Sequence, residues 1–276
     1  MSDVSLEPDG LQRSRAGGVA ARSCCFLRKQ VLGAVTVRSR CLRLILPTLV
    51  LFAAMWTGAA AARSATSTVV RPTQKLAALN SAHEAFSKPV KGSARLGVVP
   101  ARRPITGERT VLPVLGQRTG ADGLRWLQVR LPGRPNGHTG WIKQRATVAS
   151  KTSWRIVVDR SRRRVIVYQW GRPVRIVKAV VGKPSTPTPR GEFFVEEVVQ
   201  LRAADAGAPF ALALSARSNV FQEFAGGPGQ IALHGLTNVG GVLGSAVSHG
   251  CVRLDNSTMR WLVSRISPGV PVTVTR

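Results

Sequence analysis

The pattern of hydrophobic and polar residues changes near residue 97. Before it, one long apolar run interrupts a polar and basic chain, whereas after it apolar and polar residues alternate in short segments. Gly- and Pro-rich stretches separate these segments. Alternation with a period of two, bounded by turn residues, is typical of half-buried strands. We therefore expect a mostly β protein beyond this point.

Residues 97–149 are predicted to form a small domain of short antiparallel strands. Alternating segments lie at residues 110–114, 125–131 and 140–142, and the turn-rich sequences GQRTGADG and PGRPNGHTG separate them. The domain either binds a ligand outside the cell or acts as a spacer that packs on the following domain.

Residues 154–276 continue the β pattern as a second domain. Two alternating segments around residues 160–163 predict a hairpin. One helix is expected at residues 256–266, because Asp255 or Asn256 can cap it and a Ser-Pro-Gly sequence follows it. Further strands are expected at residues 173–181, 192–201, 231–233 and 270–275. The apolar face of the helix should be core: Met259, Leu262, Val263 and Ile266.

The first 96 residues are predicted to form three segments. Residues 1–43 carry eight Lys and Arg against three acidic residues and are typical of a basic cytoplasmic tail. Residues 44–62 contain no charge over 19 residues, about the length that spans a bilayer. Residues 63–96 are predicted to be a flexible spacer, with at most a short helix at residues 75–86 and a solvated His83.

The basic flank before the apolar run predicts that the rest of the chain faces outward. Two outcomes stay open for the run itself: a transmembrane anchor, or a signal segment cleaved at the alanines of residues 59–62. A buried core helix is a third interpretation. The translation start could lie downstream of Met1, because 43 residues are long for the region before a signal segment.

Cys251 is the only cysteine after the apolar run, and His234 and His249 precede it by 17 and two residues. An imidazole that accepts the thiol proton creates a nucleophilic thiolate. Gly250 permits close approach of the backbone to a substrate, so nearby amides could face a developing oxyanion. Arg253 could bind a substrate carboxylate or brace the loop. An unpaired thiol facing an oxidising compartment also favours a functional role.

Three other interpretations of this cysteine are open. A lone cysteine is often an inert small hydrophobe in the core. His234, His249 and Cys251 could supply three zinc ligands, but no further Cys or His lies nearby in the sequence. A disulfide lacks a partner cysteine after the apolar run.

Two motifs in the second domain resemble those of the L,D-transpeptidases of bacterial cell walls. In that family a His-Gly pair precedes a Ser/Thr-His-Gly-Cys-x-Arg signature, as His234 and Gly235 here precede the sequence SHGCVRL at residues 248–254. The sequence KPSTPTPRGEF at residues 183–193 resembles the family's Thr-Pro-Thr-Pro-x-Gly turn. The resemblance covers residues 154–276 and implies an L,D-transpeptidase-type β-sandwich catalytic domain with a short C-terminal helix.

The resemblance implies a role for each matching position. Cys251 would be the nucleophile and His234 its base, oriented by the carbonyl of Gly235. His249 would shape the pocket. The remaining implied roles are an oxyanion hole from the amides of Gly250 and Cys251, and a loop held by Ser248 and Arg253. Residues 202–229 lie where the family has variable strands and the lid of its active site.

The implied reaction starts when the cysteine attacks the amide before the terminal D-Ala of a tetrapeptide stem. A neighbouring stem amine then resolves the thioester and crosslinks the wall. If water resolves it, the same site is an L,D-carboxypeptidase or another peptidoglycan hydrolase. A non-catalytic wall-binding protein is the second alternative. No metal or organic cofactor is implied.

Charge and the neighbouring domain fit an extracytoplasmic location. After residue 62 the chain carries 32 Lys and Arg against 10 Asp and Glu. Such a surface attracts polyanions, and outside the cytoplasm these are acidic wall polymers rather than nucleic acid. The Gly-Trp-Ile sequence at residues 140–142 resembles the end of bacterial Src-homology-three-like barrels beside wall enzymes.

Overall fold

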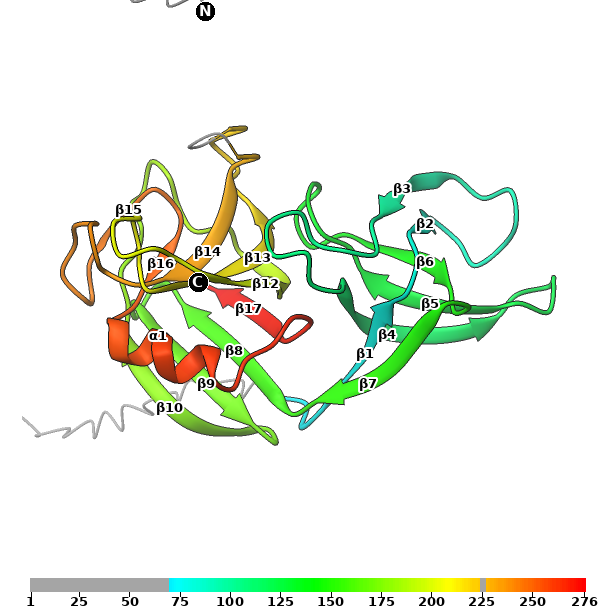
Figure 1. Ribbon diagram of the computed structural model, residues 1–276, viewed down its shortest axis with the longest axis horizontal. Helices are drawn as coiled ribbons and strands as arrows, with labels where there is room; N and C mark the ends of the chain where they lie inside the picture. The colour runs from blue at the N-terminus through cyan, green and yellow to red at the C-terminus, as the bar shows by residue number, and fades with distance from the viewer. Residues whose placement is uncertain (1–69, 224–226) are drawn as a thin grey trace, which may run out of the picture. The chain divides into compact units, whose positions relative to one another are not determined.

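The computed structural model describes residues 70–223 and 227–276, which belong to one compact unit (Figure 1). The predicted basic tail, the apolar run and the first part of the spacer lie outside the described residues. Within the described ranges, no helix has the length and apolar character needed to cross a membrane.

The first described part is a seven-stranded antiparallel sheet, which we call the small β domain (Figure 1). The predicted strands of residues 110–114, 125–131 and 140–142 are confirmed as β4, β5 and β6. Side chains from every strand of this sheet except the last pack into one core. The strands are β1 (Gln74–Leu79), β2 (His83–Phe86), β3 (Arg95–Val99), β4 (Val111–Thr119), β5 (Arg125–Arg130), β6 (Thr139–Lys143) and β7 (Thr147–Thr152), in the order β3-β2-β6-β5-β4-β1-β7.

The prediction of a flexible spacer is wrong over residues 74–96, and so is the short helix at residues 75–86. β1 lies between β4 and β7 and pairs with both, so its Leu76, Ala77 and Leu79 are buried. Local sequence gives little β preference here, and pairing with distant strands overrides it. The small β domain therefore starts well before residue 97. Its likeness to a Src-homology-three-like barrel stays a prediction.

His83 is also buried rather than solvated. Its Nδ1 lies 2.8 Å from the carbonyl oxygen of Ser81, and its Nε2 lies 2.9 Å from that of Arg145. These contacts tie the start of β2 to the turn after β6.

The second part, residues 153–276, is built on an eight-stranded mixed sheet with a separate pair of short parallel strands. This confirms the mostly β prediction, including the hairpin, in which Asp159 pairs with Arg164. The strands are β8 (Trp154–Asp159), β9 (Arg164–Gln169), β10 (Arg172–Lys178), β11 (Val181–Gly182), β12 (Gly191–Gln200), β13 (Phe210–Arg217), β14 (Gln230–His234), β15 (Ala246–Ser248), β16 (Val252–Arg253) and β17 (Pro271–Thr275). The large sheet has the order β10-β9-β8-β17-β12-β13-β14-β16, and β11 pairs with β15.

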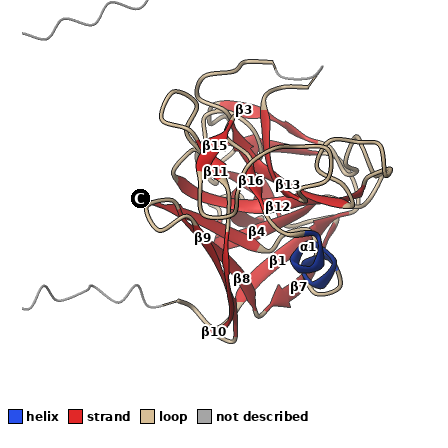
Figure 2. Cartoon of the chain, turned by 90° about the vertical axis from the view of Figure 1, so that its left-hand side faces the viewer, coloured by secondary structure: helices blue, strands red, loops and turns tan. Residues whose placement is uncertain are grey.

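The predicted helix is confirmed as α1 (Asn256–Val263), visible as the single blue ribbon in Figure 2. Asp255 caps it, and its carboxylate accepts a hydrogen bond of 2.8 Å from the amide of Thr258. The helix ends three residues earlier than predicted. Met259, Leu262 and Ile266 are nonetheless buried, while Val263 is partly buried against the same core.

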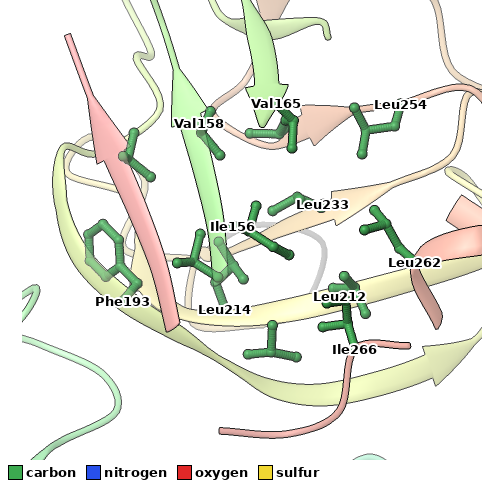
Figure 3. Packing of buried hydrophobic residues seen from close by; sticks show 14 of the residues in the cluster. Ile156, Val158, Val165, Phe193, Leu212, Leu214, Leu233, Leu254, Leu262 and Ile266 are labelled. Atoms are coloured by element: carbon green, nitrogen blue, oxygen red, sulfur yellow. The ribbon is translucent and has the colours of Figure 1, made fainter. Parts of the chain in front are cut away.

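The core of the second part lies between α1 and the large sheet. Figure 3 shows Leu262 and Ile266 next to Leu212 of β13, with Leu233 of β14 and Ile156 of β8 in the same cluster. This packing fixes β14 and the start of α1, the two elements on either side of the cysteine-containing loop.

Buried charges connect β12 and β13 to the small β domain. The carboxylate of Glu196, which is 1% exposed, pairs with Arg103 of the small β domain and, at 3.2 Å, with Arg217 of β13. Glu197 accepts hydrogen bonds from the amide and hydroxyl of Thr106 at 2.9 and 3.0 Å. Burial lowers the pKa of Arg217 to about 10, so the guanidinium stays charged at neutral pH.

Candidate active site

The parallel pairing of β14 with β16 brings the two histidine-containing motifs together. Leu233 lies opposite Val252, and His234 lies opposite Arg253. Cys251 directly precedes β16. Residues separated by a long loop in the sequence thus become neighbours at the edge of the large sheet, as the motifs predicted.

A cavity of about 360 Å³ lies beside this edge. Cys251 retains partial exposure, so the thiol is not sealed in the core. The structure brings four predicted site residues together here. The cavity is lined by residues that include His234, His249, Cys251 and Arg253, with the apolar Leu201, Ala211, Ile231 and Val239.

His234 is held in one orientation. Its Nδ1 lies 2.8 Å from the carbonyl oxygen of Gly235, the residue predicted to orient it. A carbonyl only accepts, so Nδ1 carries the proton and Nε2 is left as the acceptor. Burial lowers the pKa of His234; the Gly235 carbonyl opposes this, and the charge of Arg253 adds to it. A neutral imidazole is therefore the resting form at neutral pH.

Cys251 is a neutral thiol at rest. Burial raises the pKa of the thiol, against smaller opposing effects from the amide of Ala232 and the charge of Arg253. A raised pKa favours the neutral thiol at neutral pH, so a base has to take its proton for the sulfur to act as a nucleophile.

Ser248 holds the loop around the cysteine. Its fully buried hydroxyl donates to the carbonyl oxygen of Cys251 at 2.5 Å and accepts from the amide of Gly250 at 3.2 Å. Gly250 has a φ of 122°, and a Cβ there would lie 3.0 Å from the Cδ1 atom of Ile231. Glycine thus suits both the backbone angle and the tight space.

The same hydrogen bond involves an amide with a predicted role. The amide of Gly250 was expected to face an oxyanion together with that of Cys251, but in the resting loop it donates to Ser248. To stabilise an oxyanion, this amide has to give up its hydrogen bond to the Ser248 hydroxyl and donate to the oxyanion instead.

The Thr-Pro-Thr-Pro turn supports the loop from behind. The hydroxyl of Thr186 donates to the carbonyl oxygen of Ser248 at 3.2 Å, and the amide of Lys183 donates to the same oxygen at 2.9 Å. Thr188 accepts from the amide of Gly182 at 3.0 Å, which shapes the turn. The two sequence motifs therefore form one hydrogen-bonded unit.

Arg253 and His249 lie at the edges of the cavity. The guanidinium of Arg253 donates to the carbonyl oxygen of Gly240, so it braces the loop between β14 and β15. The exposed His249 lies with its ring 6.0 Å from that of Phe221, at an angle of 59°.

Sequence reasoning missed two supports of the base. Gly207 packs on the imidazole so closely that a Cβ there would lie 2.4 Å from His234 Nδ1. Asn256 accepts from the amide of Leu236 at 3.0 Å and donates to the Thr237 hydroxyl at 2.7 Å. Asn256 was singled out only as a helix cap, and Gly207 lies in a stretch without any motif.

Metal ligation requires a set of side chains that this part of the chain does not assemble. Within residues 70–223 and 227–276, no three or more His, Cys, Asp and Glu residues are grouped so that they could hold a metal ion. Cys251 and His234, which line one cavity, are the residue types that nucleophilic catalysis by a thiol uses.

Comparison with known proteins assigns the second part of the chain to a class. Residues 153–274 match the family model described as the L,D-transpeptidase catalytic domain. A Bacillus licheniformis protein, named provisionally as the L,D-transpeptidase YkuD, is 33% identical over 125 residues. The aligned part covers 44% of this chain and 66% of that relative.

Some solved structures are similar to part of this chain at lower sequence identity. An L,D-transpeptidase from Mycobacterium smegmatis is 20% identical with a TM-score of 0.35, covering 55% of this chain and 90% of that chain. The catalytic domain of an L,D-transpeptidase from E. faecium is 22% identical with a TM-score of 0.33, covering 44% and 96%. The finding that relates this chain to the family is the match of residues 153–274 to the model of the L,D-transpeptidase catalytic domain.

Proposed function

We propose that this protein crosslinks peptidoglycan by L,D-transpeptidation, with Cys251 as nucleophile and His234 as base. The observation that carries the proposal is that both side chains line one cavity while the Gly235 carbonyl fixes the imidazole. The family match and the name of the curated relative support the same reaction class.

The first half of the reaction forms a thioester. The sulfur of Cys251 attacks the carbonyl carbon of the third stem residue, and its proton passes to Nε2 of His234. The amide bond to the terminal D-Ala then breaks, and the leaving amine takes this proton from the imidazole. Because the thiol and the imidazole both start neutral, the resting site does not have to hold a thiolate–imidazolium ion pair.

The second half returns the enzyme to its starting state. The amine of a neighbouring stem attacks the thioester carbonyl, and His234 accepts a proton from that amine. The carbon–sulfur bond breaks, and the departing sulfur takes up the proton. A new amide crosslink and a neutral Cys251 result, with no cofactor consumed.

Two backbone amides of the loop that contains Cys251 stabilise the oxyanion that develops in each half of the reaction. The amide of Cys251 is one donor, and the amide of Gly250 becomes the second when its 3.2 Å bond to Ser248 is exchanged. The charge of Arg253 acts on both reacting groups and favours negative charge at the site.

The proposed setting is outside the cytoplasm. The apolar run at residues 44–62 would anchor the chain in the membrane or act as a signal segment, and donor and acceptor stems would be the partners. The excess of Lys and Arg after residue 62, 32 against 10 Asp and Glu, favours additional attraction to anionic wall polymers. Nucleic acid is not a proposed partner.

Incubation of the full chain with a purified disaccharide tetrapeptide tests the proposal. A crosslinked dimer together with free D-Ala is the expected product, and Cys251→Ala should form neither. If the product is monomeric tripeptide without dimer, the protein is a hydrolase rather than a transferase. If the wild-type chain binds the substrate but converts none of it, the protein is a wall-binding protein instead.

A further inference from the structure

We propose that Arg134 and Asn136 of the small β domain are positioning residues for the wall of the active-site cavity. The wall in question is the segment after β13, residues 218–221, together with Gly229. Ser218, Phe221 and Gly229 all line the cavity that contains Cys251. The substrate part of this inference rests on the proposed function, whereas its structural part does not.

Arg134 holds this wall through three backbone carbonyls. One guanidinium nitrogen donates to the oxygens of Ser218 and Phe221, both at 2.9 Å, and another donates to that of Pro228 at 3.1 Å. A planar guanidinium can bind several acceptors at once, and hydrogen bonds from a charged donor are stronger than neutral ones. A single side chain thus ties together both ends of the wall.

Asn136 fixes the point where β13 ends. Its side-chain oxygen accepts from the amide of Arg217 at 2.7 Å, and its side-chain nitrogen donates to the carbonyl of Arg217 at 2.7 Å. The same nitrogen lies 2.9 Å from the Asn219 side-chain oxygen. The amide of Asn136 therefore satisfies both backbone groups of one residue, as a neighbouring strand would.

The wall leads directly to the catalytic loop. The carbonyl of Phe221 is held by Arg134, while its ring lies 6.0 Å from that of His249. His249 is two residues before Cys251. A shift of the backbone at Phe221 would therefore change the surface that a substrate meets beside the thiol.

The effect of Arg134 should be local. β13 is held independently, because Arg217 and Arg103 pair with the buried Glu196. Arg134 itself is exposed, so its replacement leaves no cavity in the core. The loss of its three hydrogen bonds should release residues 218–221 while β12 and β13 stay in place.

The test compares the full-length wild type with Arg134→Ala, Arg134→Lys and Asn136→Ala. Arg118→Ala is the matched control, because Arg118 is an exposed arginine of the same domain and lines neither the cavity nor its wall. Two quantities are measured: hydrogen exchange of peptides covering residues 218–223, and kcat and KM with a disaccharide tetrapeptide donor.

Arg134→Ala should speed exchange in residues 218–223 at least about tenfold and leave exchange in β12 and β14 unchanged. It should raise KM about fivefold or more with kcat within about twofold, since the wall contacts substrate rather than the reacting atoms. Asn136→Ala should act in the same direction. Arg134→Lys should show smaller changes than Arg134→Ala but should not match the wild type, because an ammonium reaches fewer carbonyls than a guanidinium.

Three results would overturn the inference: unchanged exchange in Arg134→Ala, equal acceleration across the whole second domain, or faster exchange with an unchanged KM. A wild type without any turnover would instead contradict the proposed function. In that case the exchange comparison still decides whether Arg134 holds the wall.

Discussion

The Nδ1 atom of His234 lies 2.8 Å from the carbonyl oxygen of Gly235, the next residue in the chain. This contact replaces the carboxylate that orients the base in many catalytic triads. A neutral carbonyl fixes the ring without adding a full negative charge, and its effect on the pKa of His234 is smaller than that of burial. In the proposed mechanism, the base stays neutral until it receives the proton of Cys251.

The pH dependence of kcat/KM should reflect this neutral base. Burial lowers the pKa of His234 below its usual value near 6.5, so protonation inactivates the enzyme only below that pH. The acid limb of the profile, measured with a tetrapeptide donor, should have its midpoint below about 6.5. A midpoint clearly above this value would show that His234 is stabilised as a cation.

Burial shifts the pKa of the Cys251 thiol upward, whereas it shifts that of His234 downward. Because burial raises the pKa of Cys251, alkylation by iodoacetamide should reach half its maximal rate above about pH 8.5, the value of a free cysteine. Arg253→Ala should move the midpoint further up, because the guanidinium opposes the burial effect. Arg118→Ala is the control and should leave it unchanged. A midpoint below that of free cysteine would indicate a preformed thiolate.

Gly207→Ala should reduce activity by displacing the base. The new Cβ would lie 2.4 Å from His234 Nδ1, and a displacement of about 1 Å can lower kcat about 100-fold. Gly123→Ala is the matched control: φ is +70° there against +89° at Gly207, and nothing lies within 4 Å. Both variants carry similar backbone strain. Equal kcat values for the two would show that contact with His234 is not important.

Glu196→Gln should be strongly destabilising, because it leaves Arg103 and Arg217 buried beside an uncharged partner. Removing one member of a buried ion pair typically costs about 3–5 kcal/mol. Glu84→Gln removes an exposed pair with Arg95 and should cost less than about 1 kcal/mol. Urea unfolding of both variants measures the difference. Similar midpoints would contradict a structural role for the buried cluster.

The loop that contains Cys251 could be recognised in the sequence because its information is local. The motif containing Cys251 and the turn containing Thr186 and Thr188 are short, and each is held by contacts within itself or to the other. The helix after the loop was also predictable, since its cap at Asp255 and its apolar face lie within one short segment.

Other features could not be predicted because they depend on residues far apart in the chain. Arg103 and Glu196 are 93 residues apart, and Arg134 and Ser218 are 84 apart, so no local pattern marks either contact. β1 was not predicted for the same reason: its pairing with β4 and β7, rather than its own composition, makes it a strand.

Intact-mass analysis of the full chain, quenched during turnover of a disaccharide tetrapeptide, is the most direct test of the proposed chemistry. An adduct with the mass of the donor minus D-Ala should map to Cys251, and His234→Ala should form it about 100-fold more slowly or worse. Cys251→Ala should carry no adduct and release no D-Ala. Turnover by Cys251→Ala at the wild-type rate, or an adduct on another residue, would contradict the account.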